Sequence, residues 1–148
     1  MKSRSQRLLP AVDQAHRKSE QTLQQLGEQQ NRLSAAEKQL AELRRYREEY
    51  ARDRHASGMS VHILLNRQQF IDRIDGAISQ QTREVARRQR MLDMAGSAWR
   101  EAHARERALG TVVERASEVE RMRDERREQN DIDERMQHRS GHDRGRSS

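Results

Sequence analysis

The sequence has no cysteine, a single proline and only four aromatic residues among its 148 positions. Without cysteine the chain can form neither a disulfide framework nor a thiolate metal site. A hydrophobic content of 32% is low for a compact globule, which needs roughly 45% apolar residues. No stretch approaches the roughly 20 apolar residues of a membrane span, and the first ten residues lack the apolar segment of a signal peptide.

The patterns of a catalytic or metal site are missing as well. The seven glycines are scattered singly, so no phosphate-binding loop is predicted. His138 and His142 have the i, i+4 spacing of two ligands on a helix, but they lie in a segment that we expect to be disordered. We therefore expect no enzyme activity, no catalytic residue, no cofactor and no metal ion.

What the sequence does contain is a seven-residue repeat of large apolar side chains. The second half of the chain carries the longer ladder, Leu64, Ile71, Ile78, Val85, Leu92 and Trp99, and the first half carries Leu26, Leu33 and Leu40. A strict seven-residue repeat keeps one helix seam facing a partner helix and winds the pair into a left-handed supercoil. Such a coil buries only two positions per heptad, so the low apolar content suffices. The regular ladders also argue against disorder, the competing interpretation.

The two ladders predict an all-α fold, a two-helix antiparallel coiled-coil hairpin whose longer second helix overhangs the first. Residues 1–137 form a single domain, with helix one at about 8–54, the turn at about 55–60, helix two at about 61–137 and a disordered tail at 138–148. Pro10 is tolerated in a first helical turn, and Gly58 can end a helix. Ser60 and Asn66 are both plausible starts of helix two.

Folding the chain about residue 57 would place residue i opposite roughly 114 − i, if the two helices rise equally from the turn. Trp99 would then face the small Ala15. Beyond about Leu109, helix two would have no partner, which leaves an amphipathic overhang of roughly 25 residues. This overhang is either a fraying helix or a segment that docks on a partner, and the second interpretation is favoured.

The net charge is +6, and nearly all of the positive charge comes from arginine. The densest basic patch is made of Arg83, Arg87, Arg88 and Arg90. Acidic and basic residues interleave along most of the chain, as they do on the solvated flanks of coiled coils. A solvated face is therefore favoured for this patch, and binding of an anionic partner is the alternative.

Two rows of residues are predicted to lie side by side near the turn. They are Gln39, Leu43, Tyr46 and Tyr50 on helix one, and Phe70, Ile74, Ala77 and Gln81 on helix two. Three of the four aromatic residues thus gather on one exposed flank. Aromatic side chains carry much of the binding energy at protein interfaces, so this flank is a candidate binding surface. The alternative is that the aromatics plug the wider end of the coil.

The sequence resembles the FliJ family, a coiled-coil component of the bacterial flagellar type III export apparatus. The resemblance covers nearly the whole chain. It rests on four short motifs in order: Tyr46-x-x-Glu49-Tyr50, Gln68-Gln69-Phe70-Ile71, Ser97-Ala98-Trp99-Arg100-Glu101 and Asp133-Glu134. A related injectisome stalk protein shares the architecture, but the Gln-Gln-Phe and Trp-Arg-Glu elements favour the flagellar family.

The resemblance implies a non-enzymatic, stalk-like protein of flagellar biogenesis and motility. Such a protein inserts into the export ATPase FliI, links it to the export gate protein FlhA and assists export chaperones. It implies a cytoplasmic location, peripheral at the inner membrane beneath the flagellum. It also implies that the two rows of residues contact the gate, although Ile74 and Gln81 depart from the family's leucine and histidine. No nucleic acid is expected, and the open end with both termini would face the ATPase.

Two other functions stay open on the sequence alone. A long coil can pair with itself, which would make the chain a homodimeric scaffold. A basic coil can bind nucleic acid, but that requires arginines concentrated on one face.

Overall fold

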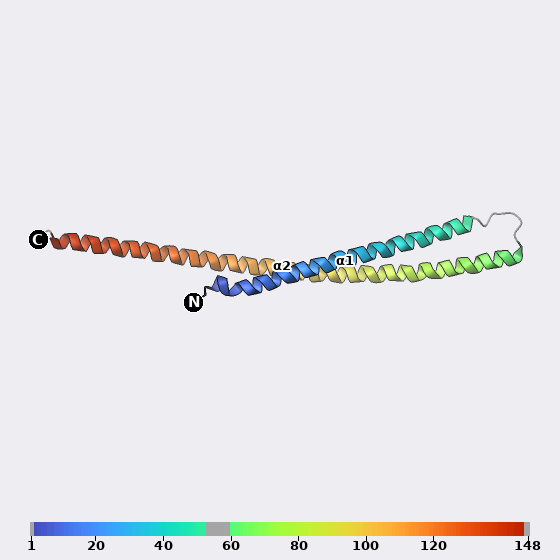
Figure 1. Ribbon diagram of the computed structural model, residues 1–148, viewed down its shortest axis with the longest axis horizontal. Helices are drawn as coiled ribbons and strands as arrows, with labels where there is room; N and C mark the ends of the chain where they lie inside the picture. Colours follow the sequence, from blue (N-terminus) through green and yellow to red (C-terminus); the bar gives the residue numbers. More distant parts are fainter. Residues whose placement is uncertain (1, 53–59, 147–148) are drawn as a thin grey trace. The chain divides into compact units, whose positions relative to one another are not determined.

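The computed structural model of the chain describes residues 2–52 and 60–146, with side chains up to residue 141. Two α-helices account for nearly all of them, α1 (Arg4–Arg52) and α2 (Val61–Arg146), and Figure 1 shows both. No strand occurs in these residues. The all-α prediction is confirmed, as is the helical hairpin with a longer second helix. The predicted turn lies almost entirely outside the described residues.

The chain divides into two compact units, each built from a piece of both helices. The hairpin unit is Ser19–Ala102, and the terminal unit combines Met1–Lys18 with His103–Ser148. Within the hairpin unit the end of α1 and the beginning of α2 lie side by side and antiparallel (Figure 1). The prediction of one domain over residues 1–137 stays a prediction.

Helix α1 begins one turn earlier than the sequence analysis predicts. The Ser3 backbone N–H donates to Gln6 Oε1 at 3.2 Å, and the Gln6 N–H donates to Ser3 Oγ at 3.3 Å. This reciprocal pair is a capping box, which satisfies N–H groups that the first helical turn leaves unpaired. Pro10 therefore lies inside α1 rather than in its first turn.

Helix α2 begins at the earlier of the two candidate positions and ends later than predicted. The Ile63 N–H donates to Ser60 Oγ at 3.4 Å, so Ser60 and not Asn66 caps the helix. At the other end α2 continues to Arg146, so the predicted end near residue 137 is wrong. Gly141 is the first weak helix former in that stretch, and a single glycine costs only about 1 kcal/mol relative to alanine.

The core of the hairpin unit is a narrow apolar seam. Its most buried members are Leu33, Ala36 and Leu40 of α1 with Ile71 and Ile74 of α2, each at most 8% exposed. Five further ladder residues are half-buried: Leu26, Ile78, Val85, Leu92 and Trp99. One stripe on each helix is thus enough to hold the two together, as in other coiled coils.

The seam becomes polar toward residue 19. Ser19 is 6% exposed and Thr22 is 3% exposed, and the Thr22 hydroxyl donates to the Ser19 carbonyl oxygen at 3.0 Å. Gln29 Oε1 is buried and has no hydrogen-bond partner among the described residues. A buried acceptor without a partner costs about 1–3 kcal/mol, so this part of the seam adds little stability.

The register differs from the predicted one by about a heptad. Arg47 pairs with Asp75, and a Cβ added to Gly96 would lie 3.9 Å from Leu26 Cδ1, so the residue numbers of both pairs add up to 122 rather than 114. Trp99 therefore lies level with the turn of α1 that contains Thr22, and its predicted position opposite Ala15 is wrong. A shift of about seven residues leaves the same seam positions facing the partner helix, so periodicity alone cannot detect it.

This register explains why Leu64 does not pack into the seam with the described residues of α1. Leu64 is 42% exposed, and its neighbours Val61, Ile63 and Leu65 are exposed as well. Arg52, the last described residue of α1, lies level with residue 70, so Leu64 lies beyond it. The ladder on α2 therefore starts one heptad later, at Ile71.

In the terminal unit, polar contacts join the beginning of α1 to α2. His16 Nδ1 lies 2.8 Å from Glu106 Oε1. The Ser5 N–H and hydroxyl both donate to the Glu120 carboxylate, at 3.1 and 2.7 Å. The predicted loss of the partner helix beyond Leu109 is therefore wrong, because α1 still contacts α2 at Glu120. Every described side chain from 121 to 141 is exposed, and we name this segment the overhang.

Because Ile71 is buried and Leu64 is exposed, truncating each to alanine should cause a large loss of stability at Ile71 and a small loss at Leu64. Ile71→Ala should lower the free energy of unfolding by about 2–4 kcal/mol, because it removes a buried side chain and leaves a cavity. Leu64→Ala should lower it by less than about 1 kcal/mol, as expected for an exposed position. Urea unfolding followed by circular dichroism measures both. Equal losses would contradict the register.

The contact between Glu120 and the first turn of α1 predicts a local dependence on pH. Hydrogen bonds from the Ser5 side chain and backbone lower the pKa of the Glu120 carboxyl. A group whose pKa is lower in the folded state stabilises the fold above its unfolded pKa of about 4.3, and this contribution disappears as the pH falls through the lowered value. The protection factor of the Ser5 amide against hydrogen exchange, corrected for the intrinsic exchange rate at each pH, should therefore fall at acidic pH, as measured by NMR.

In Glu120→Gln this pH dependence should vanish, because the side-chain amide of glutamine does not ionise in that pH range. An unchanged dependence in the variant would assign the effect to another group.

Candidate functional site

The most distinctive surface of the hairpin unit is an aromatic cluster that both helices build. The ring of Phe70 in α2 packs against two rings of α1, with centroid distances of 4.8 Å to Tyr50 and 6.2 Å to Tyr46. The Tyr46–Phe70 pair meets edge to face at 75°, a favourable arrangement for aromatic rings. Tyr46 is 50% exposed, so the cluster offers an aromatic face to solvent.

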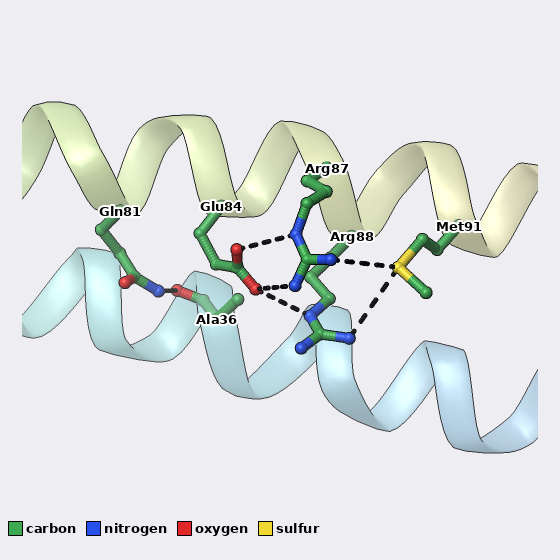
Figure 2. A network of polar contacts seen from close by, with 6 residues as sticks. All are labelled: Ala36, Gln81, Glu84, Arg87, Arg88 and Met91. Atoms are coloured by element: carbon green, nitrogen blue, oxygen red, sulfur yellow. Dashed lines mark hydrogen bonds and ion pairs between the residues drawn. The ribbon is translucent and has the colours of Figure 1, made fainter.

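The eight residues predicted to form this surface differ in how deeply they are buried. Gln39 and Tyr46 are exposed, whereas Leu43, Tyr50, Phe70 and Ala77 are half-buried. Ile74 is only 6% exposed and belongs to the seam. The half-buried Gln81 donates from Nε2 to the Ala36 carbonyl oxygen at 3.0 Å, a bond drawn in Figure 2. Ile74 and Gln81 thus mainly hold the helices together, while the aromatic residues reach the surface.

Charged side chains that the sequence analysis did not select border the aromatic cluster. The Arg67 guanidinium lies 5.6 Å from the centre of the Tyr50 ring, within range of a cation–π interaction. Arg47 pairs with Asp75 across the two helices, and this contact raises the pKa of the Arg47 guanidinium. Arg67 lies three residues before Phe70 and Arg47 lies three residues before Tyr50, so helical spacing could have identified both.

A second polar group lies further along α2, within the predicted basic patch. Figure 2 shows Arg87 and Arg88 converging on Glu84. The Arg87 guanidinium donates to both carboxylate oxygens, at 3.0 and 3.1 Å, and Arg88 Nε donates to Oε1 at 2.9 Å. The hydrogen bond from Arg87 is the largest cause that lowers the pKa of Glu84. Both guanidiniums also contact Met91 Sδ.

Among the residues that the structure describes, these surfaces are exposed faces of the two helices. A hollow lies along residues 132–141, and only α2 lines it. In the described part of the chain, no group of three histidine, aspartate or glutamate residues could hold a metal ion. Neither α1 nor α2, as far as they are described, has an apolar stretch long enough to cross a membrane.

Comparison with known proteins identifies the family of this chain. The profile of the family described as "Flagellar FliJ protein" matches residues 4–145. The chain belongs to the flagellar FliJ family. It is 34% identical over 126 residues to the Flagellar FliJ protein of Escherichia coli (strain K12) and 28% identical over 125 residues to that of Salmonella typhi. Each alignment covers 82% of this chain and 85% of the relative.

Membership of the FliJ family confirms the resemblance inferred from the four sequence motifs. All four lie inside the matched range, which extends over the aromatic cluster and the entire overhang. The match therefore concerns the full hairpin, not one of its two units alone.

Proposed function

We propose that this chain is a non-enzymatic component of the bacterial flagellar protein export apparatus, where it links the export ATPase FliI to the gate protein FlhA and assists export chaperones. Membership of the FliJ family over residues 4–145 is the observation that carries the proposal. We place the chain on the cytoplasmic side, peripheral to the inner membrane at the flagellar base.

The overhang is the part of the chain that we assign to the ATPase. Its side chains are all exposed, and they include Met122, Ile132 and Met136 at 51%, 49% and 68%. Arginines and acidic residues alternate with these apolar positions. A helix with uncovered apolar residues gains stability when a partner covers them, as in other helix-in-groove complexes. In the described residues of the free chain, no other segment covers these apolar side chains.

The aromatic cluster is the part that we assign to the gate. Tyr46, Tyr50 and Phe70 come from two helices that the seam locks in register, so the free protein already holds them in position. Binding then costs little side-chain ordering, which favours affinity. Arg67 and the Arg47–Asp75 pair at its border provide polar contacts around an apolar centre, the usual anatomy of an interface.

The mechanism that follows is coupling rather than catalysis. A change in the ATPase that favours one arrangement of the bound helices alters the free energy of binding at the gate, and the reverse holds by thermodynamic linkage. Helices packed through a heptad seam move together, since separating them exposes buried residues such as Ile71.

The assignment of the aromatic cluster predicts the effect of a double substitution. Tyr46→Ala with Phe70→Ala should weaken binding to FlhA at least about tenfold, because aromatic side chains at interface centres often contribute more than 1 kcal/mol each. Helicity should be unchanged by circular dichroism, since neither side chain is fully buried. Isothermal titration with the soluble part of the gate protein measures the affinity.

The matched control is Val119→Ala with Met122→Ala, which removes two exposed apolar side chains from the other unit. It should leave gate affinity unchanged. Full gate affinity in the aromatic double variant would refute this binding surface, while the assignment of the overhang to the ATPase would be unaffected.

A further inference from the structure

Four arginines form a stripe along the outer face of α2 in the hairpin unit. We name Arg73, Arg83, Arg87 and Arg90 the arginine stripe; all four are exposed. They follow one another at steps of ten, four and three residues, which keeps them on one side of a helix. The last three span about 10 Å and the whole stripe about 25 Å, at 1.5 Å per residue. The aromatic cluster and the overhang do not include any of them.

The positive charge of the stripe is only partly neutralised by the chain itself. No hydrogen bond or ion pair joins Arg73, Arg83 or Arg90 to another residue in the part of the chain that the structure describes. Arg87 is the exception, because Glu84 receives two hydrogen bonds from it. The Glu84 carboxylate also binds the half-buried Arg88, which lies closer to the seam (Figure 2).

The surroundings of the stripe favour a carboxylate-bearing partner over other anions. Exposed Asp72 and Asp93 lie beside it and accept hydrogen bonds from Gln68 and Gln89, so the positive charge is confined to a narrow stripe that suits discrete carboxylates at helical spacing better than a continuous row of phosphates. The stripe has no aromatic residue on which nucleobases could stack. Of the two methionines beside it, Met91 is half-buried and Met94 is 72% exposed, and a single exposed apolar residue cannot insert a helix into a lipid surface.

The contact between Arg87 and Glu84 shows how the other arginines could bind a carboxylate. A guanidinium meets a carboxylate with two parallel hydrogen bonds, a fit that depends on geometry as well as charge. A second helix that carries carboxylates at three- and four-residue steps would present them at the same intervals as Arg83, Arg87 and Arg90.

We propose that the arginine stripe binds an acidic helical segment of a partner protein, and that Glu84 competes with this segment for Arg87. The surface is separate from those assigned above to the ATPase and the gate, and the inference does not depend on either assignment.

A synthetic peptide tests the proposal with the full-length chain. The probe is a labelled alanine-based helical peptide with glutamates at i, i+4, i+7 and i+11. The comparison peptide has the same composition, with the glutamates distributed around the helix. Fluorescence anisotropy at about 50 and 150 mM salt measures both affinities, because screening weakens exposed pairs. The aligned peptide should bind more tightly at both concentrations.

Two pairs of variants locate the binding surface. Arg83→Gln with Arg90→Gln should weaken binding of the aligned peptide about tenfold, or about 1.4 kcal/mol for the two lost ion pairs together. Arg45→Gln with Arg52→Gln removes the same charge at the same spacing from α1 and should have little effect. Glu84→Gln should strengthen binding about threefold, because it releases Arg87.

The control for Glu84→Gln is Glu118→Gln. It changes the net charge equally and breaks a similar pair, between Glu118 and Arg121, away from the stripe. Equal binding of the two peptides, or equal effects of each variant and its control, would overturn the proposal. Stronger competition by duplex DNA or by anionic vesicles would overturn it in favour of a phosphate-bearing partner.

Discussion

The structure depends on the burial of one narrow apolar stripe on each of two helices. A chain with 32% hydrophobic residues cannot enclose a core on all sides, but a seven-residue repeat places a row of large aliphatic side chains along one line of each helix. Ile71, Ile74, Leu33 and Leu40 close this seam in the hairpin unit, while polar Ser19, Thr22 and Gln29 weaken it. Because the seam uses so little of each helix, most of the remaining surface is available to partners.

Periodicity was sufficient to predict the helices and their antiparallel pairing, but not their alignment. A heptad pattern looks the same after a shift of seven residues, so the repeat alone cannot fix the register; in the hairpin unit the contact of Arg47 with Asp75 and the position of Leu26 beside Gly96 reveal it. The start of α1 could have been predicted, since Ser3 and Gln6 have the spacing of a capping box. Its end and the turn fall outside the described residues.

The candidate binding surface was predictable in outline for the same reason. Steps of three and four residues place Tyr46 and Tyr50 on one side of a helix, and the fold-back brings Phe70 to them. The depth of each residue was not predictable, because it depends on the angle at which the second helix packs. Ile74 therefore looked like a surface residue in the sequence, but it is buried in the structure.

These features assign the seam to stability and the exposed faces to partners, in a chain of the FliJ family. The most direct measurement is capture of the full-length chain by the flagellar export ATPase of the same organism at near-physiological salt, with the rate of ATP hydrolysis recorded. The account predicts saturable binding that increases hydrolysis and that is lost when the overhang is removed. Absence of binding and an unchanged rate of hydrolysis would contradict it.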